Sequence, residues 1–174
     1  MDREQYVINS ARIEPAKVEF WSYCKYTLPA FYKEHRLHLK HMCNTLQAFY
    51  EGRIRKKLNG SWIIFQDVKS IPPQYNIICK KIILNAPPRH GKTLTVQKLC
   101  EWVLGDKQEN RVITISYNET LSGRLSKQVR DNIEAETLKE EQIIFTDIFE
   151  GIKIKAGDSA RKVWSLEGQH FRLS

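Results

Sequence analysis

The stretch APPRHGKT at residues 86–93 constrains this chain more than any other feature, because it is close to a phosphate-binding loop. It departs from the consensus G-x-x-x-x-G-K-[ST] only at Ala86, which stands where the first glycine is expected. In such a loop Gly91 lets the backbone approach the phosphates, the Lys92 ammonium pairs with the β- and γ-phosphates, and the Thr93 hydroxyl binds Mg²⁺. The following helix directs the positive end of its dipole at the same anion.

The missing glycine does not exclude a nucleotide site. That glycine serves mainly the tight exit from the preceding strand, and Pro87 and Pro88 can impose the exit because their rings fix φ. The flanking sequences also fit. The apolar run 77–86 predicts a strand, and 93–105 predicts a helix that ends at Gly105.

A second strand and a second helix follow at the expected distance. The run RVITISY at 111–117 predicts a strand, and 119–133 predicts an amphipathic helix because apolar residues recur every four positions. The order strand, loop, helix, strand, helix is typical of an α/β unit. We therefore predict an α/β fold, a P-loop NTPase with a mainly parallel sheet.

The chain upstream of the loop divides into three parts. Residues 1–15 are a polar lead-in, and 16–52 form a helical segment with a break near Pro29. Residues 53–76 form an insertion before the core. The P-loop core then occupies 77–174.

The insertion contains the pair Asn59-Gly60 between two β-prone stretches, a pattern typical of a β-hairpin because both residues tolerate positive φ. A basic cluster lies beside it. Its side chains either meet phosphates or form a solvated surface. The cluster consists of Arg53, Arg55, Lys56 and Lys57.

Composition indicates a globular protein that contacts polyanions. The net charge of +8 and pI of about 9.3 favour contact with nucleic acid. Runs such as WIIF at 62–65 are too short to span a bilayer, and the charged N-terminus predicts no signal peptide. The four cysteines are widely spaced and form no Cys-x-x-Cys pair, which predicts reduced thiols in a cytoplasm.

The loop spelling PPRHGKT closely resembles that of large terminase subunits, the DNA-packaging motors of tailed double-stranded DNA phages. There P-P-R-H-G-K-[ST] is usual, and a residue other than glycine commonly fills the position of Ala86. The resemblance covers roughly residues 18–173 and departs from the family at about 57–77, which typical members lack. Other similar stretches are 38–54, 111–133, 147–154 and 163–168.

The resemblance implies the ATP-binding motor region of a phage or prophage large terminase subunit, an ATPase of the additional-strand class that requires ATP and Mg²⁺. It implies catalytic roles for Lys92 and for Arg89, which would stabilise the γ-phosphate from within the same subunit. Thr93 would bind Mg²⁺ through its hydroxyl. The nucleotide-binding residues implied are Pro88, Arg89, His90, Gly91, Lys92 and Thr93.

The resemblance also implies partners and a place of action. These are double-stranded DNA, the portal protein and the small terminase subunit, in a homo-oligomeric ring at the procapsid portal in the host cytoplasm, with no membrane. Family members continue into an acidic Walker B strand and a metal-dependent nuclease domain, and the sequence contains neither. We therefore expect a fragment, truncated before the acidic strand, that hydrolyses ATP slowly or not at all alone.

Some residues invite a catalytic or metal-binding interpretation that the pattern does not favour. Asp147 and Asp67 each end an apolar run, but Asp147 has no adjacent second carboxylate and Asp67 precedes the loop. His35, His38 and His41 recur every three residues, so at ~100° per residue the first and the last point about 120° apart around a helix. We predict surface or packing roles for these histidines.

Four arginines are candidates for a residue that acts in trans in a ring of subunits, and nothing in the sequence chooses among them. They are Arg124, Arg130, Arg161 and Arg172.

Two alternative functions remain open. The first is another P-loop NTPase, such as a DNA helicase or a small-molecule kinase. The second is a non-hydrolysing module that binds nucleotide or DNA. Binding of Mg-ATPγS that depends on Lys92 separates the second from an ATPase.

Overall fold

The protein consists of two compact units, which α4 connects. The loop unit is Tyr32–Thr95, and the helical unit combines Met1–Phe31 with Val96–Ser174. The computed structural model describes residues 3–107, 109–136, 143–157 and 164–168, with only the backbone described for residues 3–10.

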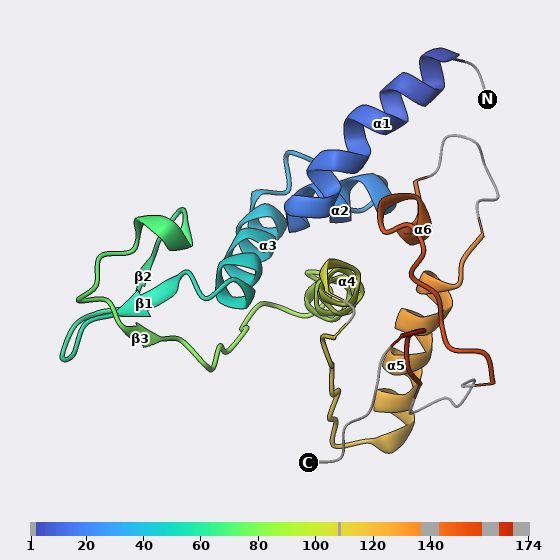
Figure 1. Cartoon of the computed structure of the whole chain (residues 1–174). Coiled ribbons are helices and arrows are strands. Elements are labelled where there is room, and N and C mark those ends of the chain that lie inside the picture. The colour runs from blue at the N-terminus through green and yellow to red at the C-terminus, as the bar shows by residue number, and fades with distance from the viewer. Residues whose placement is uncertain (1–2, 108, 137–142, 158–163, 169–174) are drawn as a thin grey trace. The chain divides into compact units, whose positions relative to one another are not determined.

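The loop unit contains one helix and a small antiparallel sheet with strand order β2-β1-β3 (Figure 1). Its elements are α3 (Leu37–Tyr50), β1 (Ile54–Lys56), β2 (Ile63–Ile64), the 3₁₀ helix η1 (Val68–Ser70) and β3 (Ile77–Ile78). β1 pairs with both neighbours, so Arg55 lies opposite Ile63 on one side and Ile78 on the other. The predicted hairpin is present, but residues 57–62 connect β1 and β2. Asn59 has a φ of 61° in a turn closed by the Gly60 amide and the Lys57 carbonyl at 3.1 Å, whereas Gly60 has no positive φ.

The helical unit surrounds the middle of α4 with helices from both ends of the chain. Its elements are α1 (Arg3–Val18), α2 (Phe20–Thr27), α5 (Glu119–Ile133) and α6 (Phe145–Ile148), and α4 (Lys92–Asp106) enters it from the loop unit. The Trp102 indole N–H donates to the Ala16 carbonyl at 3.0 Å, and its ring lies 5.7 Å from that of Phe20. These contacts fix α4 against the N-terminal helices.

The helices follow the sequence expectations closely. α5 covers 119–133 as predicted, and α3 ends just before Gly52, whose φ of 67° is that of a C-terminal glycine. The break expected near Pro29 lies between α2 and α3. The helical segment, however, begins at Arg3 and not at Ala16, and the lead-in contains several good helix formers, among them Glu4, Gln5 and Ala11.

α4 differs from the prediction at its end. Gly105 was expected to terminate it, but the helix continues to Asp106 and Gly105 is buried inside it without a positive φ. A Cβ at this position would lie 2.3 Å from the ring of Phe149. The glycine is therefore explained by close packing and not by a helix cap.

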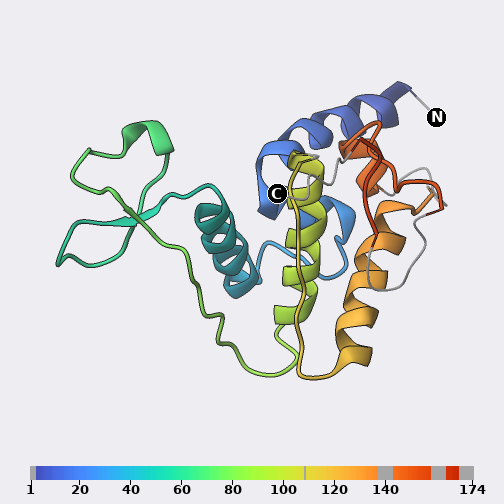
Figure 2. The ribbon, with the colours of Figure 1, turned by 60° about the horizontal axis from the view of Figure 1, so that its bottom comes forward.

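The strands differ more. Within the expected strand 77–86 only Ile77–Ile78 is paired, and 111–117 is in no strand (Figure 2). The sheet in the described part of the chain is antiparallel. Ile115 and Tyr117 are 90% and 97% exposed, as is Ile83 at 93%. An apolar alternating run becomes a strand only when a neighbour accepts its backbone hydrogen bonds.

No helix within the described residues is long and apolar enough to cross a lipid bilayer.

Candidate nucleotide-binding loop

Over four successive residues of the 86–93 loop, the backbone angle φ alternates between positive and negative values. Arg89 and Gly91 have φ values of 63° and 81°, whereas His90 and Lys92 have negative φ. Successive residues of alternating hand point their N–H groups into one concavity, which is the anion-binding arrangement called a nest. The φ values of the loop therefore have the alternation of such a nest, in which the His90 amide is already bonded to the Pro87 carbonyl.

A turn explains how a non-glycine residue adopts this conformation. The His90 amide donates to the Pro87 carbonyl at 3.4 Å, with Pro88 and Arg89 at the centre of the turn. Proline followed by a residue of positive φ is the pattern of a type II turn, in which glycine normally takes the place that Arg89 occupies. Arg89 is thus held in an unfavourable conformation inside the candidate site.

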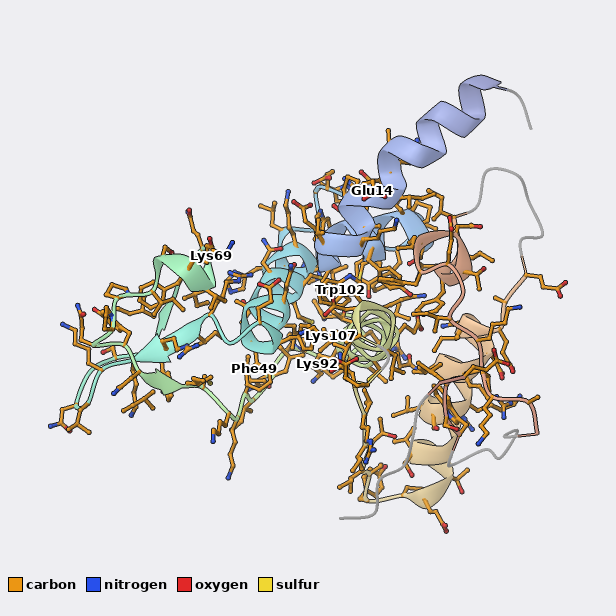
Figure 3. All side chains as sticks on the ribbon, in the orientation of Figure 1. Glu14, Phe49, Lys69, Lys92, Trp102 and Lys107 are labelled. Carbon is orange, nitrogen blue, oxygen red and sulfur yellow. The ribbon has the colours of Figure 1, made fainter. Side chains whose placement is uncertain are left out.

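Lys92 closes the loop. It is the first residue of α4, and its ammonium donates to the carbonyl of Ala86, at the beginning of the loop, at 2.5 Å (Figure 3). This neutral carbonyl is a weaker partner for an ammonium than a phosphate is. Lys92 is half-buried, and its charge is held at the Ala86 carbonyl.

The first turn of α4 is anchored by a buried pair of hydroxyl groups. The Thr95 amide donates to the Gly91 carbonyl at 2.8 Å, and the Thr95 hydroxyl lies 3.1 Å from that of Tyr32. Both side chains are buried. Thr93, on the same turn, is exposed, so its hydroxyl is open to solvent at the positive end of the helix dipole.

The remaining loop residues are exposed. Pro88, Arg89 and His90 face solvent, while Gly91 is half-buried. The His90 ring accepts or donates a hydrogen bond at the Pro88 carbonyl, 2.9 Å away, and lies edge-on at 5.6 Å from the ring of His38 on α3. The predicted site residues are consecutive in sequence and lie together. The structure adds Tyr32, for which the sequence held no signal, and His38, for which a surface or packing role was predicted.

The two aspartates that could be mistaken for an acidic strand cap short helices. The Asp147 carboxylate accepts from the Ile144 amide at 2.9 Å at the beginning of α6, and that of Asp67 accepts from the Lys69 amide at 3.0 Å in η1. Each carboxylate satisfies a backbone donor at a helix N-terminus. In the described part of the chain, no group of three or more His, Cys, Asp or Glu side chains is placed to hold a metal ion.

The candidate trans-acting arginines have different surroundings. Arg124 is exposed on α5, whereas Arg130 forms ion pairs with Asp131 and Glu134. Arg161 and Arg172 lie outside the described residues, as does Val163 at the beginning of the stretch 163–168.

A buried ionic cluster on α4 was not predicted. The Glu101 carboxylate is fully buried and accepts from the Tyr23 hydroxyl at 2.8 Å, the Lys98 ammonium at 2.8 Å and the Asn132 amide at 2.7 Å. These hydrogen bonds of the Glu101 carboxylate connect α2, α4 and α5. Burial, with a smaller contribution from the Glu101 charge, raises the pKa of the neighbouring Cys100 thiol to about 11. Only the i,i+3 spacing of Lys98 and Glu101 is visible in the sequence.

Comparison with known proteins gives no match for this chain: no family model, no curated protein and no solved structure matches it.

Proposed function

We propose that the 86–93 loop binds the phosphates of Mg-ATP. The observation that carries the proposal is the alternating backbone from Arg89 to Lys92, which leads directly into the first turn of α4. Backbone donors, an ammonium and a helix N-terminus then act on one anion. Arg89 and His90, both exposed, add side chains that can reach the outer phosphates.

The finer proposal is that the chain is the ATP-binding motor region of a large terminase subunit, which uses ATP to package double-stranded phage DNA. It is supported by the loop spelling PPRHGKT and by the helix at 119–133. The proposed fold is that of a P-loop ATPase with a mainly parallel sheet, and 79–86 and 111–117 are the segments it would use as strands. The proposed setting is a subunit ring at the procapsid portal in the host cytoplasm.

Each side chain of the loop has a separate role in the proposed site, which follows from its chemistry. The Lys92 ammonium neutralises the β- and γ-phosphates, and Arg89 contacts the γ-phosphate. The Thr93 hydroxyl is a suitable Mg²⁺ ligand, because this ion is usually held by few protein oxygens together with phosphates and water. Bound Mg²⁺ supplies charge neutralisation at the phosphate oxygens.

The test is equilibrium binding of a fluorescent ATP analogue in the presence of Mg²⁺. Lys92→Ala should weaken binding about 10- to 100-fold, since a hydrogen bond to a charged group contributes about 1.5–3 kcal/mol. Lys107→Ala is the matched control, an exposed lysine just beyond the other end of α4 (Figure 3). It should bind like the wild type.

Equal binding by the wild type and Lys92→Ala would contradict the nucleotide site. It would favour a module that merely holds DNA, whose binding is sensitive to salt and independent of Lys92. ATP hydrolysis by the chain alone is expected to be slow or absent. Fast turnover that disappears in Lys92→Ala would support an ATPase and overturn the expectation of slow hydrolysis.

A further inference from the structure

We propose that residues 53–81, here named the basic sheet, form a docking surface for duplex DNA. The segment contains β1, β2, β3 and η1, and all of it belongs to the loop unit. It lies outside the 86–93 loop. The proposal does not rest on the nucleotide site, so either can fail without the other.

The first support is charge. The basic sheet carries seven Lys and Arg residues and one acidic residue, a net charge of +6 in a chain of +8. The single carboxylate, Asp67, is occupied in capping η1. So dense a local charge favours a partner with closely spaced negative charges, and duplex DNA carries one per about 1.7 Å of axis.

The second support is that most of these cations are not neutralised. Five lysines of the basic sheet form no ion pair within the described residues, and four of the five are exposed. Lys69, on η1, is one of them (Figure 3). The five are Lys56, Lys57, Lys69, Lys80 and Lys81.

The pairing register argues against a membrane surface as the partner. Residues directly opposite each other lie on one face of a sheet, so Arg55 shares a face with exposed Ile63 and Ile78. Lys56 shares the other face with Ile54, which is two residues away on the same strand. Cations therefore interrupt the apolar side chains on both faces, whereas a membrane-binding surface gathers its apolar side chains on one face.

The aromatic contacts favour duplex over single-stranded DNA. Single strands are held largely by bases that stack on free aromatic rings. Here the Lys56 ammonium lies 4.9 Å from the centre of the Trp62 ring, and that of Lys57 lies 5.2 Å from Tyr75. The ring of Phe65 packs edge-on against Tyr75 at 5.1 Å. Tyr75 is thus in contact with both Lys57 and Phe65, and half-exposed Trp62 is the one aromatic ring of the basic sheet on which a base could stack, so the surface offers mainly cations to a phosphate backbone.

The test is binding of the whole chain to a fluorescent 30-base-pair duplex across a series of salt concentrations. One variant replaces four exposed lysines of the basic sheet with glutamine: Lys57, Lys69, Lys80 and Lys81. The matched control replaces four exposed lysines elsewhere and has the same net charge: Lys33, Lys107, Lys153 and Lys155.

The sheet variant should bind at least tenfold more weakly, with a salt slope shallower by up to about 0.9 for each phosphate contact removed. The control should bind like the wild type, and circular dichroism should show both variants folded. Equal weakening in the two variants would overturn the proposal, because binding would then follow net charge alone. Tighter binding to a single strand of equal length, or to phosphatidylserine vesicles but not DNA, would also overturn it.

Discussion

Glu101 is a charged residue that lies in the protein interior, whereas a carboxylate is ordinarily more stable in water. Its carboxylate is fully buried and depends on one ammonium and two neutral donors. A buried ion pair contributes little net stability compared with apolar residues of the same size, but removing one partner leaves an uncompensated charge. The cluster therefore makes the helical unit sensitive to single substitutions.

We predict that Glu101→Ala lowers the free energy of unfolding by about 3–5 kcal/mol, because the buried Lys98 ammonium loses its partner. Adding Lys98→Met should recover part of the loss. Asp131→Ala removes an exposed partner of Lys127 and Arg130, and it should cost at most about 1 kcal/mol because Arg130 keeps its pair with Glu134. Urea denaturation of the wild type and the three variants measures all three effects, and a Glu101→Ala loss no larger than that of Asp131→Ala would contradict the buried cluster.

Cys100, next to Glu101, links stability to pH. An exposed thiol has a pKa of 9.0, and burial raises the pKa of Cys100 to about 11 in the folded protein. Below pH 9 the thiol is neutral in both states. Between pH 9 and 11 only the unfolded chain ionises, so the stabilisation is lost as the pH rises.

We predict that the stability difference between the wild type and Cys100→Ala falls by about 2–3 kcal/mol from pH 8 to pH 11. Comparison with the alanine variant cancels the titration of all other groups. Denaturation curves at several pH values measure the difference. If it stays constant over this range, the thiol is not buried as described.

At the scale of elements, α4 is shaped by a residue more than forty positions away. Gly105 lies inside the helix, where alanine would ordinarily be more stable by about 1 kcal/mol. The Phe149 ring, which follows α6, occupies the space that a Cβ would need. Helix propensity therefore favours alanine at this position, whereas packing against Phe149 favours glycine.

We predict that Gly105→Ala lowers the free energy of unfolding by about 1–3 kcal/mol despite the gain in helix propensity, because overpacking outweighs it. The double variant Gly105→Ala/Phe149→Leu should lose less than the sum of the two single variants, since the smaller side chain relieves the clash. Thermal unfolding of the set gives this coupling. Stabilisation by Gly105→Ala would mean that Phe149 does not pack here.

At the scale of the whole molecule, the chain leaves an apolar extended segment uncovered. Ile113 is 83% exposed and Ile115 is 90% exposed, within 111–117, which pairs with no strand. Extended apolar segments with free backbone groups favour pairing with other chains. The purified chain should therefore associate as its concentration rises.

We predict that Ile113→Thr/Ile115→Thr reduces this association and leaves the unfolding temperature within about 2 °C, because exposed substitutions change stability little. Sedimentation velocity and thermal unfolding measure the two effects. A marked fall in the unfolding temperature would instead show that both side chains are buried, as strands of the proposed parallel sheet would be.

Features that depend on neighbouring residues could be predicted from the sequence. α5 follows from its apolar spacing, and the structure adds Asn118 as its N-cap, whose side chain accepts from the amides of Thr120 and Leu121. The candidate site was also readable, because the loop residues are consecutive and their roles follow from their chemistry. Such features need no information from distant parts of the chain.

The remaining features depend on contacts between segments that are far apart in the chain. The roles of Gly105, Tyr32 and Glu101 depend on partners distant in sequence, which no local pattern specifies. The same holds for strands, since an alternating apolar run such as 111–117 records a tendency, while pairing requires a neighbour with free hydrogen-bonding groups. Helices close their hydrogen bonds within themselves, so their positions were predicted better than those of the strands.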